Sequence, residues 1–395
     1  MAFPLRHLLN ARFRASTRYG WTPYGALDSG ARELLSGLRS ESALAGVLTP
    51  AGAGVAIRGL DAESAGLWSA LSEPGPLPES VLALAEDGVA VARLVLDGVL
   101  EVEHEGRFVS GADAFPAVFD GAAVPKGTGP LARLSLDALE YGASLELDDP
   151  IALSWRLYRF NTLPISPEWR RRLPDQRAVA AFLGLGGFDA RAASLHAAMG
   201  EHRRSAHGGW LTWDLRRETS AGKGGPRWKL YVSPEVEALP EVLHCVLALL
   251  PEWPAAVSLK VGADLPGLLR PDKCVAYFST RDQLDAAAAR LAAELEGMPA
   301  HGVPFSADAG GGGLLSWGMD PPGDRPVLRW LGVESWRLRI THQLAAALRI
   351  ARTAGPGAAA ASTVALGRIL LEGVDPVTWA PIDHAGPAEQ SVARH

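Results

Sequence analysis

Three lysines on neighbouring predicted strands are the residues whose chemistry stands out. Lys229 lies in WKLYVS, Lys260 in AVSLKVG and Lys273 directly before CVAYFS. Amines brought together in this way bind anions, and a lysine with a lowered pKa can act as a general base. One interpretation is therefore an anion site made of these three lysines. The other interpretation is a solvated sheet face, whose lysines prevent pairing at an open strand edge.

No other constellation in the sequence predicts a catalytic or metal site. GGGGLLSW (310–317) lacks the Lys-Ser/Thr ending of a phosphate loop and leads into a strand. His196, His202 and His207 are six and five residues apart, which does not place them on one helical face. Both cysteines lie in apolar segments, as small buried thiols do. We therefore expect no cofactor and no metal, and we assign no catalytic residue from spacing alone.

The strands that carry the lysines belong to a predicted order of strands and helices. Helices are predicted at 235–250 and 282–297, one after the first lysine strand and one after the third. Further strands are predicted in VPFSAD (303–308) and LLSWGMD (314–320), and they complete the order strand-helix-strand-strand-helix-strand. This is the split, ferredoxin-like βαββαβ arrangement. Alternation along the first strand puts Lys229 and Tyr231 on the same face.

The N-terminal part of the sequence reads as three helices and a hairpin. The helices are predicted at 61–71, 79–85 and 88–96, and a turn at Glu105-Gly106 joins the two hairpin strands. A helix followed by such a hairpin ends a winged helix-turn-helix. The fold class is therefore α+β, with a winged-helix domain at 1–125, a helical segment at 126–208, an α+β domain at 209–353 and a partly flexible tail at 354–395.

Charge argues against nucleic acid as the partner of this winged helix. Between Arg58 and Arg107 ten carboxylates face three arginines, a net charge of −7, whereas DNA is bound by neutralising its phosphates. The third helix, DGVAVARLVL, offers one arginine and otherwise apolar side chains, so it cannot read base edges. A strand beside an apolar helix can instead bind an extended peptide.

Residues 45–110 resemble the leader-peptide recognition domains of ribosomal peptide natural-product (RiPP) pathways, the PqqD-like winged helices. The resemblance lies in GLDAESAGLWSALSEPGPLPESVLAL and in the following helix that ends LVLDGVLEV. It implies that a leader peptide docks between the third strand and the third helix. The expected contact residues are Val55, Ile57, Val91, Arg93, Leu94 and Val95. The alternative is a winged helix used only for packing or dimerisation.

Three further resemblances concern the rest of the chain. SWRLYRFNTLPISPEW (154–169) is similar to the leader-binding partner proteins of crocagin and methanobactin pathways. Lys260 in SLKVG and Lys273 in DKCVAYF resemble the phosphothreonine-lyase domains of lanthipeptide synthetases, which use a lysine base, an acid histidine and phosphate-binding arginines. No histidine neighbours either lysine on its strand, which departs from that pattern. RWKLYV is also similar to strands of aromatic prenyltransferases, whose repeated strand-helix units are missing here.

The sequence thus favours a peptide-binding partner protein of natural-product biosynthesis. It would bind the leader of a precursor peptide and present the core to modifying enzymes of the same pathway. The alternative is a peptide-modifying enzyme, a lyase or transferase, with its site in the C-terminal domain. We expect a cytoplasmic location, because both cysteines read as reduced, buried thiols. No membrane partner is expected, because no apolar run reaches the ~18 residues of a membrane span, and the acidic charge argues against nucleic acid. The oligomeric assembly that we consider for the protein is a homodimer.

Overall fold

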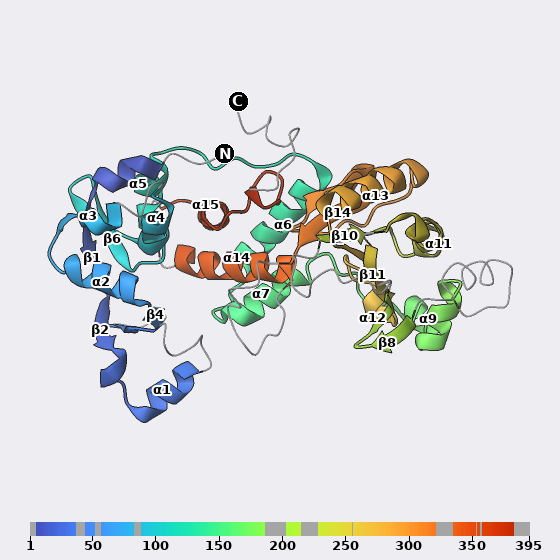
Figure 1. The fold of residues 1–395 in the computed structure, drawn as a ribbon, viewed down its shortest axis with the longest axis horizontal. Coiled ribbons are helices and arrows are strands. Elements are labelled where there is room, and N and C mark those ends of the chain that lie inside the picture. The colour runs from blue at the N-terminus through green and yellow to red at the C-terminus, as the bar shows by residue number, and fades with distance from the viewer. Residues whose placement is uncertain are drawn as a thin grey trace.

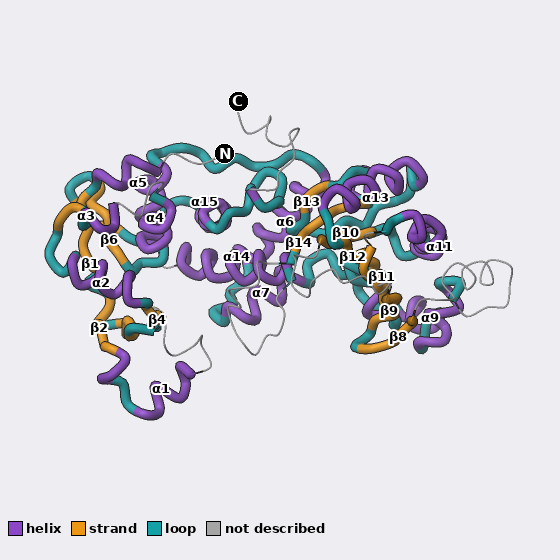
Figure 2. The backbone as a smooth tube through the Cα atoms, in the orientation of Figure 1, coloured by secondary structure: helices purple, strands orange, loops and turns teal. Residues whose placement is uncertain are grey.

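The computed structural model describes residues 5–36, 44–51, 57–82, 88–185, 203–214, 228–254, 256–320, 335–352, 354–355 and 358–382. The protein combines helices with antiparallel sheets. Figure 1 shows strands at both ends of the molecule, and Figure 2 shows that the region between the two ends is helical. None of the described helices is both long and apolar enough to cross a membrane.

The predicted helices and hairpin of the N-terminal part are present. They are α2 (Ala62–Ala70), α3 (Glu79–Leu82), α4 (Val89–Leu96), β6 (Leu100–His104) and β7 (Arg107–Val109). Asp61 begins α2, because its Oδ1 accepts a hydrogen bond from the Ser64 amide at 2.8 Å. Glu105 and Gly106 both have positive φ, which a two-residue hairpin turn requires.

Two small sheets complete this N-terminal unit, and the N-terminal arm contributes to both. The first has the order β5-β1-β6-β7 and adds β1 (Arg12–Ala15) and β5 (Gly75–Pro76) to the hairpin. The second has the order β2-β3-β4, made of β2 (Tyr19–Pro23), β3 (Gly46–Pro50) and β4 (Arg58–Leu60). A 3₁₀ turn at Leu5–Asn10 packs on α4, and α1 (Ser29–Ser36) follows β2.

The middle of the chain is helical, as the sequence predicted. Its helices are α5 (Phe115–Phe119), α6 (Pro130–Ser144), α7 (Pro150–Tyr158), α8 (Pro167–Arg172) and α9 (Gln176–Phe182). Four of the five carry a proline in the first turn, where the missing amide proton costs nothing.

The C-terminal sheet has seven antiparallel strands in the order β13-β14-β10-β12-β11-β9-β8. They are β8 (Arg203–His207), β9 (Trp210–Asp214), β10 (Trp228–Val232), β11 (Ala256–Gly262), β12 (Cys274–Phe278), β13 (Ala307–Asp308) and β14 (Leu315–Met319). Because β14 and β12 flank β10, Lys229 does not guard an open edge, and it is only 7% exposed. The interpretation of the lysine face as a solvated edge was therefore wrong for β10.

Helices cover both faces of this sheet. One face, which carries Leu230, Leu259, Ala276 and Trp317, is fully buried, and α11 (Leu239–Leu249) and α13 (Arg281–Glu294) belong to the same core. The short α12 (Leu265–Leu268) follows β11. Along the chain, the elements β10, α11, β11, β12, α13 and β14 follow in this sequence, with α12 between β11 and β12 and β13 between α13 and β14. The other face carries Lys229 and Tyr231 and lies against α7 and α14 (Trp336–Arg352).

The C-terminal segment contains a buried helix where the sequence suggested a partly flexible tail. In α15 (Ala361–Leu371) the side chains of Leu366 and Ile369 are fully buried, and the helix packs on α14 and α4. Gly367 allows a close approach, since a Cβ there would lie 2.6 Å from the Phe115 ring. Residues 356–357 and 383–395 of the expected tail lie outside the described residues.

Candidate active site

The second face of the large sheet gathers charged and phenolic side chains. Lys229 on β10 is paired with Tyr277 on β12, and Lys260 on β11 is paired with Val275, two positions before Tyr277 on β12. Alternation places these side chains on one face of the sheet. Helices α7 and α14 and the loop before β12 add further groups. We call the set the cationic cluster, which consists of Lys229, Lys260, Arg270, Asp272, Arg337, Tyr158, Tyr231 and Tyr277.

Asp272 is the buried anion of the cationic cluster. Its carboxylate accepts two hydrogen bonds from Arg270, at 2.8 and 2.9 Å, and one from the Tyr158 hydroxyl at 3.1 Å. Arg337, which is 1% exposed, forms an ion pair with it at 3.2 Å. Burial by itself would raise the pKa of Asp272, but Arg337 and Arg270 hold that pKa well below its usual value. Asp272 therefore stays ionised and fixes both arginines.

Lys260 differs from the other cations of the cluster in its surroundings. Its Nζ lies 4.4 Å from the centre of the Trp210 ring and 5.3 Å from that of Tyr277. Within the described part of the chain, no carboxylate or hydrogen-bond acceptor pairs with this amine. Burial lowers the pKa of Lys260 to about 8, against the attraction of Asp272 and with the help of Lys229. A substantial neutral fraction of the amine therefore exists just above neutral pH.

Lys229, unlike Lys260, has an acid partner in the described ranges of the chain. Its Nζ forms an ion pair with Asp320 and lies 5.6 Å from the centre of the Tyr277 ring. The ring of Tyr277 thus lies near both a lysine with an acid partner and a lysine without one among the described residues. Burial raises the pKa of Tyr231 well above its ordinary value, and it also raises that of Tyr158. Both phenols are therefore neutral hydrogen-bond donors.

Lys273 does not join the other two lysines. It is fully buried, and its Nζ donates to the Pro234 carbonyl at 2.8 Å and to His301 Nδ1 at 2.5 Å. His301 Nε2 in turn donates to the Asn161 carbonyl at 2.7 Å. Burial lowers the pKa of Lys273 to about 7, and burial together with Lys273 lowers that of His301 to about 4. The imidazole is therefore neutral, and both of its nitrogens are already hydrogen-bonded.

The pair Lys273–His301 thus joins three segments rather than facing a substrate. It connects the start of β12, the loop before β13 and the end of α7. A histidine near a lysine is present after all, although the two are 28 residues apart in the chain and not on one strand. Sequence spacing gave no signal for this pair. Asp272, Arg337 and Tyr158 were missed for the same reason.

Replacing Lys273 by methionine should remove a pH dependence of stability. The amine has a pKa of about 7 in the folded protein and 10.5 as its ordinary value. Between these limits the unfolded chain binds more protons, so the free energy of unfolding of the native protein rises with pH. The slope reaches up to ~1.4 kcal/mol per pH unit. Urea unfolding at several pH values should show this rise relative to Lys273→Met. Parallel curves would contradict it, and the exposed Lys126→Met is the matched control.

The residues expected to line a leader groove are placed differently from the sequence interpretation. Val91 and Val95 are buried, at 1% and 0% exposure, because the 3₁₀ turn at Leu5–Asn10, α5 and α15 surround α4. Leu94 is half-buried between two apolar clusters. The assignment of Val91 and Val95 to an open groove wall was therefore wrong.

The other expected contact residues lie near the same helix. Arg93 donates to the Leu371 carbonyl at 2.8 Å and pairs with Glu372 at 3.5 Å, so it joins α4 to α15. Ile57 is 62% exposed. Val55 lies outside the described residues.

Neither the cysteines nor other side chains suggest a metal site in the described part of the chain. Among those residues, no group of three or more His, Cys, Asp or Glu side chains could hold a metal ion. Cys245 and Cys274 are free thiols, and burial raises the pKa of Cys274 to about 12. This thiol is therefore protonated and unreactive.

Comparisons with known proteins gave no family. No family model and no curated protein matches the sequence. An effector protein from Pseudomonas syringae pv. tomato strain DC3000 overlaps 62% of this chain and 96% of its own, with 14% identity and a TM-score of 0.40. The effector from P. syringae pv. syringae strain 61 overlaps 63% and 97%, with 14% identity and a TM-score of 0.39. A phosphothreonine lyase overlaps 53% and 98%, with 10% identity and a TM-score of 0.24. These overlaps are too loose to transfer a fold or an activity.

Proposed function

We propose that the protein is a peptide-modifying lyase, which removes phosphate from a phosphorylated serine or threonine by β-elimination at the cationic cluster. The observation that carries the proposal is the environment of Lys260. This amine has a pKa of about 8, has no acid partner among the described residues, and lies in a cluster that also contains Arg270 and Lys229. Such an elimination needs a base whose pKa lies near the working pH and cationic side chains that bind the phosphate.

The proposed reaction is redox-neutral. The neutral Lys260 amine takes the Cα proton of the phosphorylated residue, and the electrons of the C–H bond form the Cα=Cβ double bond. The Cβ–O bond breaks, and its electrons leave with the phosphate. The products are a dehydroamino acid in the peptide, free phosphate and a lysine ammonium, which then returns its proton to solvent.

Arg270 is the group best placed to bind the phosphate. Its Nε and Nη2 donate to Asp272, while Nη1 has no hydrogen-bond partner among the described residues. Its side chain is 33% exposed, and its guanidinium lies 5.1 Å from the centre of the Trp210 ring that Lys260 also contacts. Base and anion-binding group thus share one aromatic side chain. Arg337 is too deeply buried for this role and positions Tyr158, because its Nη2 donates to the Tyr158 carbonyl at 2.9 Å.

A non-catalytic leader-binding partner is the second candidate function. The order α2-α3-α4-β6-β7 supports a winged-helix reading of the N-terminal unit, and exposed Ile57 favours contact with a partner. The sheet order β14-β10-β12-β11 likewise supports a ferredoxin-like core in the C-terminal part. This candidate requires peptide binding without turnover.

Phosphate release from phosphoserine and phosphothreonine peptides separates the two candidates. We expect elimination, visible as free phosphate and as a dehydroamino acid trapped by an added thiol. The rate kcat/KM should rise about tenfold per pH unit at low pH and level off above the pKa of Lys260, about 8, because only the neutral amine accepts the proton. Absence of release between about pH 6 and about pH 10 would refute the lyase proposal.

A further inference from the structure

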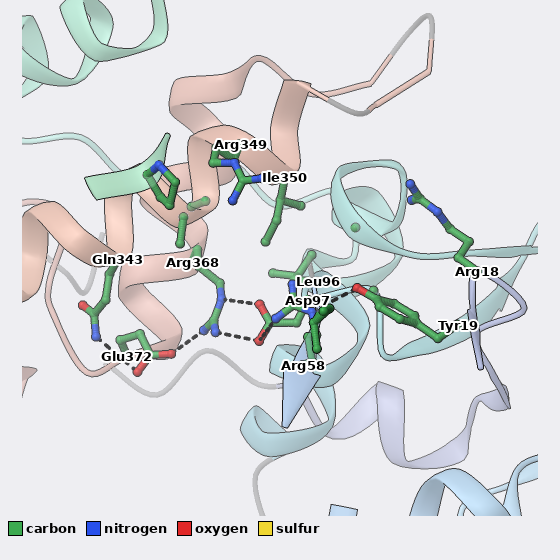
Figure 3. A pocket seen from close by; sticks show the side chains of 16 residues that line it. Arg18, Tyr19, Arg58, Leu96, Asp97, Gln343, Arg349, Ile350, Arg368 and Glu372 are labelled. Carbon is green, nitrogen blue, oxygen red and sulfur yellow. Dashed lines mark hydrogen bonds and ion pairs between the residues drawn. The ribbon is translucent and has the colours of Figure 1, made fainter. Parts of the chain in front are cut away.

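A cleft of about 350 Å³ lies between the N-terminal unit and the C-terminal helices (Figure 3). Tyr19, Ile57 and Leu96 line it from the N-terminal unit, and Ala346 and Ile350 line it from α14. The volume is within the range of small-ligand sites, which begins at roughly 300 Å³. The cleft therefore offers apolar contact for one or two side chains of a ligand.

Four charged side chains that line the cleft pair with one another. Asp97 accepts from Arg368 at 3.1 Å and pairs with Arg58 at 3.7 Å. Arg368 also pairs with Glu372, which in turn pairs with Arg93 outside the cleft lining, so these side chains form one network (Figure 3). The network joins the two parts of the molecule, and the two arginines and two carboxylates of it that line the cleft balance in charge.

Two further arginines give the cleft its charge. Arg18 is exposed and Arg349 is half-buried, and both line the cleft. Neither guanidinium has an acid partner in the described part of the chain. Figure 3 shows them on opposite sides, Arg18 from the N-terminal unit and Arg349 from α14. The surplus of two positive charges around an apolar lining suits an acidic ligand with apolar side chains.

The cleft and the cationic cluster lie along the same pair of helices. Helices α7 and α14 run side by side in opposite directions, since Ser154 Oγ meets Thr341 Oγ1 at 3.1 Å and Arg337 donates to the Tyr158 carbonyl. Pro150 lines the cleft at one end of α7, and Tyr158 belongs to the cationic cluster at the other end. At ~1.5 Å per helical residue, the two ends are about 12 Å apart.

Exposed apolar side chains lie on α7 between the two sites. Ile151 and Trp155 are 40% and 39% exposed, and their spacing of four residues puts them on one helical face. The Trp155 ring meets the Tyr158 ring edge to face at 5.6 Å. An extended peptide rises about 3.3 Å per residue, so about four residues would cover the length of α7.

We propose that the cleft binds an acidic, apolar segment of the same peptide whose phosphorylated residue reacts at the cationic cluster. The segment lies at least about four residues from the reacting residue, and its carboxylates face Arg18 and Arg349. This inference rests on the proposed lyase function for the identity of the peptide. The cleft would then set which peptides are substrates, without touching the reacting atoms.

Binding is tested with a fluorescent, unphosphorylated peptide of alternating aspartate and leucine, measured by anisotropy. The double variant Arg18→Glu/Arg349→Glu should raise its Kd at least about tenfold, or ~1.4 kcal/mol. The control Arg107→Glu/Arg177→Glu makes the same change in net charge at positions outside the cleft and should leave the Kd nearly unchanged. Equal effects of the two double variants would overturn the inference, as would competition by duplex DNA as strong as that by unlabelled peptide.

Elimination kinetics with phosphopeptides give a second, independent test of the cleft. With a phosphoserine placed about six residues from the acidic segment, the double variant should raise KM and leave kcat unchanged, because the contact is equal in ground and transition states. With a short phosphopeptide lacking the segment, wild type and variant should be equal. Binding that depends on Arg18 and Arg349 without any elimination would refute the lyase function while keeping the cleft as a peptide site. Elimination whose KM is the same in wild type and the double variant would support the lyase function and refute the cleft as a peptide site.

Discussion

Substitution of Lys260 by alanine should lower kcat/KM for phosphate elimination by about 10²- to 10⁴-fold, the usual contribution of a general base. The loss follows because neither Lys229 nor Lys273 can replace it. Lys229 is engaged by Asp320, and Lys273 is fully buried and bonded to Pro234 and His301. The fold should be retained, since Lys260 makes ring contacts but no ion pair within the described residues.

The variant Lys260→Arg separates the base from the charge. Arginine keeps a cation beside Trp210 but cannot be deprotonated in proteins. We therefore expect KM to change little and kcat to fall as far as in Lys260→Ala, with phosphate release as the measurement. If Lys260→Arg turns over at the wild-type rate, Lys260 acts only by its charge, and the base is another group.

Local patterns predicted the elements of the fold well. Alternation in WKLYVS placed Lys229 and Tyr231 on one face, and β10 has this arrangement, with Leu230 fully buried on the other face. Asp61 marked the start of α2, and Glu105-Gly106 marked the hairpin turn. Each of these signals depends on residues a few positions apart, which is the range over which sequence reports structure.

Contacts between distant segments were beyond the reach of such patterns. Val91 and Val95 were expected at a groove, but α15, some 270 residues later, covers this part of α4, as the bond from Arg93 to the Leu371 carbonyl shows. The helix itself was missed because GPGAAAAS reads as a loop, and the large apolar residues of α15 begin only at Val364. Because α15 was not predicted as a helix, its packing against α4 could not be predicted either.

The candidate site was predicted only in its cations. The sequence singled out Lys229 and Lys260, and the structure brings both amines within 6 Å of the centre of the Tyr277 ring, at 5.6 and 5.3 Å. It did not indicate that Lys273 turns away to His301, or that a single carboxylate organises the cluster. Arg337 lies among apolar residues of a helix, and a charged residue in such a stripe is a signal that a buried partner exists.

The replacement Asp272→Ala should give the largest loss of stability among single substitutions in the cluster. It leaves Arg337, which is 1% exposed, with a buried and uncompensated charge, and it removes the acceptor of both Arg270 bonds. Breaking a buried ion pair in this way costs about 3 to 5 kcal/mol. Urea unfolding should show this loss. Glu294→Ala, which breaks the exposed pair with Arg290, is the control and should cost no more than about 0.5 kcal/mol.

A double variant and the pH dependence identify the cause of the loss. If the unpaired charge of Arg337 is responsible, Asp272→Leu/Arg337→Met should be more stable than Asp272→Ala, because it removes both charges of the ion pair. The pKa of Asp272 is held below its ordinary value, so its contribution is present above about pH 4 and is lost as the pH falls below that value. The difference in unfolding free energy between wild type and Asp272→Ala should therefore shrink in acid. A difference that stays constant with pH would show that Asp272 acts through packing and not through its charge.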